Sequence, residues 1–221
     1  MGGAFHPTFD ELPRTISIFP LSGALLLPGG QLPLNVFEPR YLNMVRDALG
    51  AERMIGMIQP TEPERTTEDD RPPVYPIGCA GRITAFSEAD DGRFLITLTG
   101  VCRFKRGREL PLLNGYRRVE ALYDRYQEDL DPPGQLSVDR DRLLSALRRF
   151  LDMQEIEADW QSVKEAGDAY LITALAMVCP FEPQEKQAIL EASDLSARAE
   201  TIIALLEMGG LDAAESSPAR H

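Results

Sequence analysis

Cysteine and histidine are the side chains in this sequence best suited to hold a metal or act as nucleophiles, and their spacing argues against both roles. The chain has three cysteines, Cys79, Cys102 and Cys179, and two histidines, His6 and His221. No Cys-x-x-Cys pair occurs, and the histidines lie near opposite ends, whereas zinc sites and Cys-His or Ser-His-Asp sites need converging ligands or partners. We expect no metal and no cofactor, and we interpret the cysteines as small core residues in a reducing compartment.

Carboxylates are the other candidates for chemistry, as general acids and bases. They cluster at Glu68-Asp69-Asp70 and Asp90-Asp91, in segments predicted to be loops or turns, where solvated charge is the simpler interpretation. A third group, Glu38-Pro39-Arg40, lies at the start of a predicted helix. Its charged pair could orient a ligand carboxylate, or Glu38 could stabilise the amino terminus of that helix. The sequence supports no catalytic residue, and we expect a protein that is not an enzyme.

The proline-rich segment 18–41 positions that charged pair. It contains four prolines and three glycines among apolar runs, which predicts a short strand, a turn, a second short strand and then a helix. Pro39 lies in the first turn of the helix, where its missing N–H costs no hydrogen bond. We expect the helix to end before Gly50 and to bury one apolar face, formed by Leu42, Val45 and Leu49.

The following part, residues 54–127, has the two-residue period of β-strands. Ala89-Asp90-Asp91-Gly92 predicts a tight hairpin turn, because Asp-Gly tolerates positive φ. In the strand after it, Phe94, Ile96 and Leu98 alternate with Leu95, Thr97 and Thr99. Strands are predicted at 54–58, 74–86, 94–104 and 116–123, with an exposed, proline-rich loop at 61–73.

Beyond residue 136 the period changes to that of helices. Four helices are predicted, the first capped by Ser137, the second running from Val163 to Val178 with Tyr170 on its apolar stripe, and the last stopped by Gly209-Gly210. The predicted organisation is a flexible leader at 1–14, a β-domain at 15–127, a linker at 128–136, a helical subdomain at 137–210 and a disordered tail at 211–221.

Four segments carry short motifs that occur in a fixed order along the chain. The first comprises Phe-Pro-Leu, Leu-Pro-Gly and Pro-Leu-Asn-Val-Phe-Glu-Pro-Arg-Tyr within 19–41, and the next is Gly-Cys-Ala-Gly-Arg-Ile at 78–83. A strand ending in Gly-x-x-Arg-Phe follows at 98–104. The last segment contains Pro180-Phe181-Glu182-Pro183, Lys186-Gln187, Leu190-Glu191 and Arg198. Together, over roughly residues 15 to 208, they resemble the Lon protease amino-terminal domain family, also called the Lon substrate-binding domain.

The resemblance implies an α+β fold, with a mostly antiparallel, PUA-like β-barrel or sheet followed by an all-helical bundle. Lon proteases hydrolyse ATP and cut peptides with a Ser-Lys pair, but on other domains. None of the three lysines, Lys105, Lys164 and Lys186, precedes Ser or Thr as in a nucleotide phosphate loop. We therefore expect a stand-alone Lon-domain protein without ATPase or protease activity.

Net charge restricts the partners. The chain carries a formal charge of −12, whereas binding a phosphate backbone needs clustered Lys and Arg. The densest basic cluster, Arg103-Lys105-Arg106-Arg108, is predicted to point to both sides of a strand. No apolar run approaches the ~20 residues of a membrane-spanning helix, and no signal peptide is evident. We expect a cytoplasmic protein that binds neither nucleic acid nor membranes.

Polypeptide binding needs exposed apolar surface and a free strand edge, which can pair with an extended chain of almost any sequence. The candidate contacts are Leu25, Leu26, Leu27, Met54, Met57 and Arg40. Apolar runs of this kind more often belong to the core, which is the other interpretation of these residues. We predict binding of unfolded or partly folded polypeptides in protein quality control, with a protease or a chaperone as a further candidate partner. The alternative is a scaffold or regulatory protein that binds one folded partner.

Overall fold

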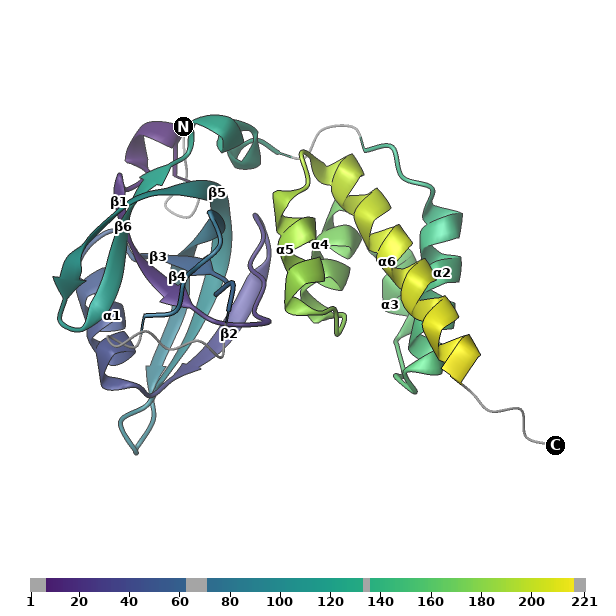
Figure 1. Cartoon of the computed structure of the whole chain (residues 1–221), viewed down its shortest axis with the longest axis horizontal. Helices are drawn as coiled ribbons and strands as arrows, with labels where there is room; N and C mark the ends of the chain where they lie inside the picture. Colours follow the sequence, from purple (N-terminus) through teal and green to yellow (C-terminus); the bar gives the residue numbers. More distant parts are fainter. Residues whose placement is uncertain (1–6, 63–70, 133–135, 217–221) are drawn as a thin grey trace. The chain divides into compact units, whose positions relative to one another are not determined.

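The structure is a computed structural model that describes residues 7–62, 71–132 and 136–216, with side chains described as far as residue 209. It divides into two compact units, Met1–Pro132 and Pro133–His221 (Figure 1). The first contains the β-sheet and the second is all-helical, and the α+β class predicted from the sequence is confirmed. The division falls within residues 128–136, but the first part of that predicted linker belongs to a 3-10 helix, η2 (Asp124–Leu130).

The sheet closes into a barrel. Its order is β2-β5-β4-β3-β1-β6, and because β5 also pairs with β6, five strands form a ring while β2 lies outside it. The pair β1–β3 is parallel and the other pairs are antiparallel. The strands are β1 (Thr15–Pro20), β2 (Gln31–Val36), β3 (Met54–Ile58), β4 (Ile77–Glu88), β5 (Phe94–Leu113) and β6 (Tyr116–Leu122).

Strand β5 is the longest element of the barrel and pairs with three others. Its first part pairs with β2 and β4, and its last part, from Lys105 onward, pairs with β6. It continues past the predicted end at residue 104 to Leu113, where the Asn114-Gly115 turn, with φ of 49° and 88°, leads into β6. The hairpin predicted between β4 and β5 is present, with Gly92 at φ 81°.

The barrel core follows the predicted alternation. Phe94, Ile96 and Leu98 are buried, as the sequence predicted. Phe104, fully buried, packs against two glycines on neighbouring strands. A Cβ added at Gly56 or Gly78 would lie 2.9 Å from Phe104 Cζ, so this ring occupies space that only glycine leaves open.

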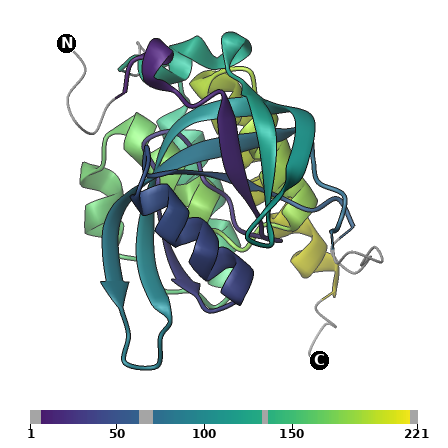
Figure 2. The same ribbon diagram turned by 90° about the vertical axis from the view of Figure 1, so that its left-hand side faces the viewer.

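Helix α1 (Pro39–Leu49) begins at Pro39 and is followed by Gly50 at its carboxyl end, as predicted. It lies across one side of the barrel (Figure 2). The predicted buried face was partly wrong, because Leu42 and Leu49 are only half-buried. The Tyr41 ring packs 4.2 Å from that of Phe19 and turns the helix, so that the buried residues are Tyr41, Met44, Val45 and Ala48.

Two predicted flexible segments look different in the structure. Within residues 7–14, Phe9–Glu11 form a 3-10 helix, η1, and the buried Leu12 follows it. The Tyr123 hydroxyl donates to the Pro13 carbonyl at 3.2 Å. This part of the leader is therefore packed on the barrel, while residues 1–6 lie outside the described chain. The two ends of the loop predicted at 61–73 are hydrogen-bonded to each other, since Thr61 N donates to Pro73 O at 2.9 Å. Residues 63–70 of this loop lie outside the described chain.

As far as the helical unit is described, it contains five helices rather than the four predicted. Asp139, not Ser137, caps the first, and the predicted second helix is divided in two, which exposes Tyr170 and Val178. A Cβ on Gly209 would lie 2.9 Å from the Phe150 ring, so this glycine serves close packing rather than ending the last helix. That helix includes part of the predicted tail. The five are α2 (Arg140–Met153), α3 (Trp160–Glu165), α4 (Asp168–Val178), α5 (Pro183–Glu191) and α6 (Leu195–Ser216).

Candidate functional site

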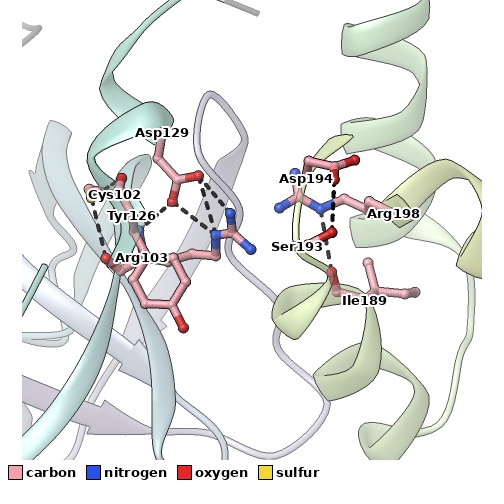
Figure 3. A network of polar contacts seen from close by, with 8 residues as sticks. All are labelled: Cys102, Arg103, Tyr126, Asp129, Ile189, Ser193, Asp194 and Arg198. Atoms are coloured by element: carbon pink, nitrogen blue, oxygen red, sulfur yellow. Dashed lines mark hydrogen bonds and ion pairs between the residues drawn. The ribbon is translucent and has the colours of Figure 1, made fainter. Parts of the chain in front are cut away.

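The arginine of the Gly-x-x-Arg-Phe motif joins β5 to η2. Arg103 forms an ion pair with Asp129 of η2, in which its backbone N, Nε and Nη2 each donate to a carboxylate oxygen at 2.9 Å (Figure 3). The two side chains are 5% and 9% exposed. The guanidinium also lies 4.7 Å from the Tyr126 ring centroid. This buried ion pair fixes η2 against β5, so its role is structural.

In the helical unit, the motif residues Gln187 and Arg198 and the neighbouring Asp194 have the same kind of role. Asp194 caps α6, because its Oδ1 accepts a hydrogen bond from Ala197 N at 2.8 Å. Arg198 is buried, and its Nε donates to the Ile189 carbonyl at 3.4 Å, which links α6 to α5. Within α5, the buried Gln187 donates to Glu191 at 2.7 Å. These residues stabilise helix ends and helix contacts.

The apolar residues predicted as a binding surface belong to the interior. Leu25, Leu26 and Leu27 are 2%, 1% and 0% exposed, and Met54 and Met57 are 7% and 2% exposed. The prediction that they form an exposed surface is therefore wrong. The leucine run is held inward by close packing, since a Cβ on Gly81 would lie 2.5 Å from Leu26 Cδ2. The methionines lie in β3, whose five residues are all buried between β1 and β4.

Arg40 lies on α1 and pairs with Glu38 at the start of that helix. Its Nε and Nη2 each lie 2.9 Å from Glu38 Oε2, and the two side chains are 31% and 43% exposed. The guanidinium also lies 4.8 Å from the Tyr41 ring centroid. Of the two roles considered for this pair, the geometry favours the structural one, because the charges neutralise each other at the start of the helix.

We expect replacement of Arg40 by alanine to have a small effect. The pair is partly solvated, so its loss should lower the free energy of unfolding by about 0–1 kcal/mol rather than the larger amount typical of a buried pair. Urea denaturation followed by circular dichroism measures this. The comparison is Arg103→Ala, which removes a buried guanidinium. If Arg40→Ala lowers the free energy of unfolding as much as Arg103→Ala does, Arg40 has a larger structural role than its exposure indicates.

The apolar surface that the structure does expose lies on a three-stranded ribbon. We use this name for β2, residues 83–88 of β4 and residues 94–99 of β5, which extend beyond β3. The register puts Leu95 beside Asn35 and Ser87, and in the next row of the same face Thr97 beside Pro33 and Ala85. Leu95 is 47% exposed, and small side chains surround it. They leave a shallow depression of about 490 Å³.

Among the described strands, none pairs with the outer edge of β2. Gly100 N donates to Gly30 O at 2.8 Å, which fixes the alternation of hydrogen bonds along the β2–β5 pair. By that alternation residues 31, 33 and 35 direct their backbone groups away from β5. Pro33 has no N–H, but Gln31 and Asn35 offer both a donor and an acceptor to an added strand. This edge borders the depression around Leu95.

The opposite face of the ribbon is packed rather than open. Phe86 is 44% exposed at its rim, and its ring meets that of Phe94 edge-on at 5.0 Å. Arg46 of α1 covers Phe94, with its guanidinium 4.9 Å from the ring centroid. Phe94 itself is buried. Within the described residues of the sheet unit, the ribbon is thus supported from α1 on one face, while its other face and the outer edge of β2 have no covering element.

Sequence reasoning missed this surface, although one signal was present. Leu95 lies on the side of the predicted strand that otherwise carries Thr97 and Thr99, so it is an apolar residue on the solvent face. That β2 has an edge without a strand partner could not be inferred from the sequence, because it depends on which strands pair. The predicted site residues are not brought together at any surface: five are buried, and Arg40 lies on α1.

Neither metal chemistry nor an activated thiol is indicated in the described part of the chain. No group of three or more His, Cys, Asp or Glu side chains is placed to hold a metal ion among those residues. Burial raises the pKa of Cys102 to about 12 and that of Cys179 to about 11, so both thiols stay protonated. As far as the chain is described, none of its helices has the length and apolar character needed to cross a bilayer.

Comparisons with known proteins agree with this architecture. The sequence profile described as the ATP-dependent protease La (LON) substrate-binding domain matches residues 15–208. The chain therefore belongs to the family of the Lon substrate-binding domain. The crystal structure of a Lon N-terminal domain protein from Xanthomonas campestris is similar, with 25% identity and a TM-score of 0.62 over 86% of this chain and 97% of that one.

Full Lon proteases are similar over part of their length. Lon protease 2 of Myxococcus xanthus is 25% identical over 205 residues, covering 89% of this chain and 24% of that protein. Lon protease 2 of Sorangium cellulosum is 28% identical, covering 90% and 26%. The chain thus spans about a quarter of the length of these relatives. The N-terminal domain of Mycobacterium avium complex Lon protease shares the fold, with a TM-score of 0.59 at 14% identity over 88% of this chain and 98% of that one.

Proposed function

We propose that this chain binds unfolded or partly folded polypeptides, and that the three-stranded ribbon is the surface that binds them. An extended segment would pair with the open edge of β2 and place apolar side chains in the depression around Leu95. The observation that carries the proposal is the open edge of β2 beside this exposed leucine. Membership of a substrate-binding family supports the same role.

The physical basis is main-chain pairing. Backbone hydrogen bonds along a strand edge are nearly independent of sequence, so they suit a module that meets many different chains. The shallow depression adds apolar contact without demanding one side-chain shape, since Ala85, Ser87 and Thr97 are small. We propose that the protein acts in protein quality control, without hydrolysing ATP or peptide bonds itself, and that a protease or a chaperone receives the bound polypeptide.

Replacing Leu95 by aspartate should weaken binding of an unfolded apolar peptide about tenfold, because a charge in the depression must be desolvated when the peptide binds. The measurement is fluorescence anisotropy with a labelled, uncharged peptide of apolar and Gln residues. Leu95 is nearly half exposed, so the substitution should leave the fold intact, which circular dichroism verifies.

The matched control is Val178→Asp. Val178 is 81% exposed on α4, so it receives the same charge on an exposed apolar position of the other unit. The control should bind the peptide as the unchanged protein does. If both variants bind with unchanged affinity, the ribbon is not the binding surface. If neither the unchanged protein nor the variants bind unfolded peptides, the proposed function is wrong.

The same α4 surface favours the alternative function. Tyr170 and Val178 are 73% and 81% exposed two turns apart on a helix that carries almost no polar residues. An exposed apolar stripe of this kind is typical of a surface that meets a folded partner. Affinity purification with Val178→Asp separates the two functions, since a single folded partner would be lost while binding of unfolded peptides would remain.

A further inference from the structure

Positive charge is concentrated on one hairpin of this acidic protein. We call residues 105–122 the basic hairpin; it comprises the last part of β5, the Asn114-Gly115 turn and β6. Although the whole chain carries a net charge of −12, this segment contains five cations and two carboxylates. The cations are Lys105, Arg106, Arg108, Arg117 and Arg118, and the carboxylates are Glu109 and Glu120.

Both carboxylates are already paired within the hairpin. Arg117 donates from Nε and Nη2 to the two oxygens of Glu109, each at 2.8 Å, and Arg108 donates to Glu120 at 2.8 Å. Three cations remain, Lys105, Arg106 and Arg118, and none of them has an ion-pair partner among the residues that the structure describes. In addition, Nε of Arg106 and Nε of Arg118 are buried and have no hydrogen-bond acceptor there.

Leucines accompany these charges on one face. The register pairs Lys105 with Leu122 and Arg118 with Leu110, which puts all four on the same side of the hairpin. Leu122 is 46% exposed, and Leu113, which the register pairs with Tyr116 on the same side, is 38% exposed. Along one edge of the hairpin, β4 pairs with β5 as far as Lys105 and Arg106 N donates to Pro76 O at 2.7 Å, and no described strand pairs with that edge beyond Arg106. Within the described part of the chain, the surface therefore combines three cations that lack an ion-pair partner, exposed apolar side chains and a stretch of β5 edge without a strand partner.

We propose that the basic hairpin binds an acidic polypeptide segment in which carboxylates are interspersed with apolar residues. This inference rests on the proposed function and adds a class of substrate to it. Lys105 and Arg118 would bind the carboxylates, and Leu122 and Leu110 would contact the apolar side chains. The overall negative charge of the protein predicts the opposite preference, but charges more than about 10 Å away are largely screened at physiological salt, so the local excess decides.

The small number of cations without an ion-pair partner on the basic hairpin, and the negative net charge of the whole chain, favour a peptide over other anionic partners. Stable attraction to an anionic membrane takes clusters of about four to eight Lys or Arg, more than the three unpaired here. A nucleic acid is a long polyanion, and a protein of net charge −12 repels it over most of its surface. A short acidic segment meets only the hairpin, so it gains the local attraction and avoids most of the repulsion.

The test compares two labelled peptides by fluorescence anisotropy, one of alternating Glu and Leu and one in which Gln replaces every Glu. The variant is Lys105→Glu with Arg118→Glu. We expect it to weaken binding of the Glu peptide about tenfold, because each charge reversal removes an attraction and adds a repulsion. Binding of the Glu peptide by the unchanged protein should also weaken as salt rises to about 0.5 M. Binding of the Gln peptide should be unchanged in both comparisons.

The control is Arg149→Glu with Lys164→Glu, which changes net charge equally but on exposed positions of the helical unit. It should bind the Glu peptide as the unchanged protein does. An equal loss in both variants would mean that only net charge matters and would overturn the proposal, as would tighter binding to anionic vesicles or single-stranded DNA. If the Gln peptide binds and the Glu peptide shows no dependence on the hairpin, this inference alone fails. If neither peptide binds, the proposed function fails with it.

Discussion

Replacing Asp129 by alanine should lower the free energy of unfolding of the sheet unit by about 3–5 kcal/mol. The substitution leaves the Arg103 guanidinium, which is 5% exposed, without its carboxylate, and an unpaired buried charge costs more than the pair contributes. It also removes the acceptor for Arg103 N, so a buried backbone donor is left unsatisfied. Urea denaturation followed by far-ultraviolet circular dichroism measures the change. Hydrogen exchange should show the loss first in η2 and in the adjoining part of β5.

Glu120→Ala provides the matched comparison. It breaks the Arg108–Glu120 pair, which has the same chemistry and a distance of 2.8 Å, but its side chains are 73% and 42% exposed. Its cost should stay below about 1 kcal/mol. The double variant Arg103→Met with Asp129→Leu should recover much of the stability lost in Asp129→Ala, because apolar residues of similar size tolerate this burial. If Asp129→Ala costs no more than Glu120→Ala, burial does not govern this pair.

Local patterns predicted much of the fold. Alternation placed Phe94, Ile96 and Leu98 in the core, and Asp-Gly predicted the hairpin before them, since both depend on a few adjacent residues. Pro39 and Gly50 likewise marked the ends of α1. In each case the physical cause lies within the window that the sequence displays. Predictions of this kind need no knowledge of the tertiary fold.

Predictions failed where the cause lies far along the chain. Arg103 and Asp129 are separated by 26 positions, so their pairing is invisible to any local pattern. Gly209 resembles a helix stop, but it faces Phe150 across the helix pair and the helix continues. Tyr170 and Val178 have helical spacing, and only the packing of α4 shows that they lie outside the core.

The candidate site was missed for the same reason. A leucine run such as 25–27 has a composition that fits an exposed binding surface and a core equally well. Whether it is buried depends on which other parts of the chain pack against it. The open edge of β2 follows from the order of strands in the sheet, which residue types do not specify. Leu95 alone carried a local signal, as an apolar residue on a strand face that otherwise carries threonine.

Replacing Gly100 by alanine should have a comparably large effect. An added Cβ would lie 1.9 Å from the Leu27 carbonyl oxygen and 2.6 Å from the Leu27 carbonyl carbon, and both are backbone atoms that cannot turn aside. The chain is held close there because Gly29 N donates to Gly100 O at 2.9 Å and Gly100 N donates to Gly30 O at 2.8 Å. Relieving the clash must break these bonds, so we expect a loss of about 3 kcal/mol or more in the free energy of unfolding.

The effect should extend from stability to binding. Residues 27–30 lead directly into β2, so a displaced backbone there moves the open edge of the three-stranded ribbon, and uncharged peptides should bind more weakly even where the protein remains folded. Gly50→Ala is the control, because its Cβ would lie 3.6 Å from the nearest atom at an ordinary φ of −79°, and its cost should stay within about 1 kcal/mol. Equal stability of the two variants in urea would mean that the backbone near Leu27 yields easily. In that case the edge of β2 would not depend on Gly100, and the close approach would not explain why glycine opens the Gly-x-x-Arg-Phe motif.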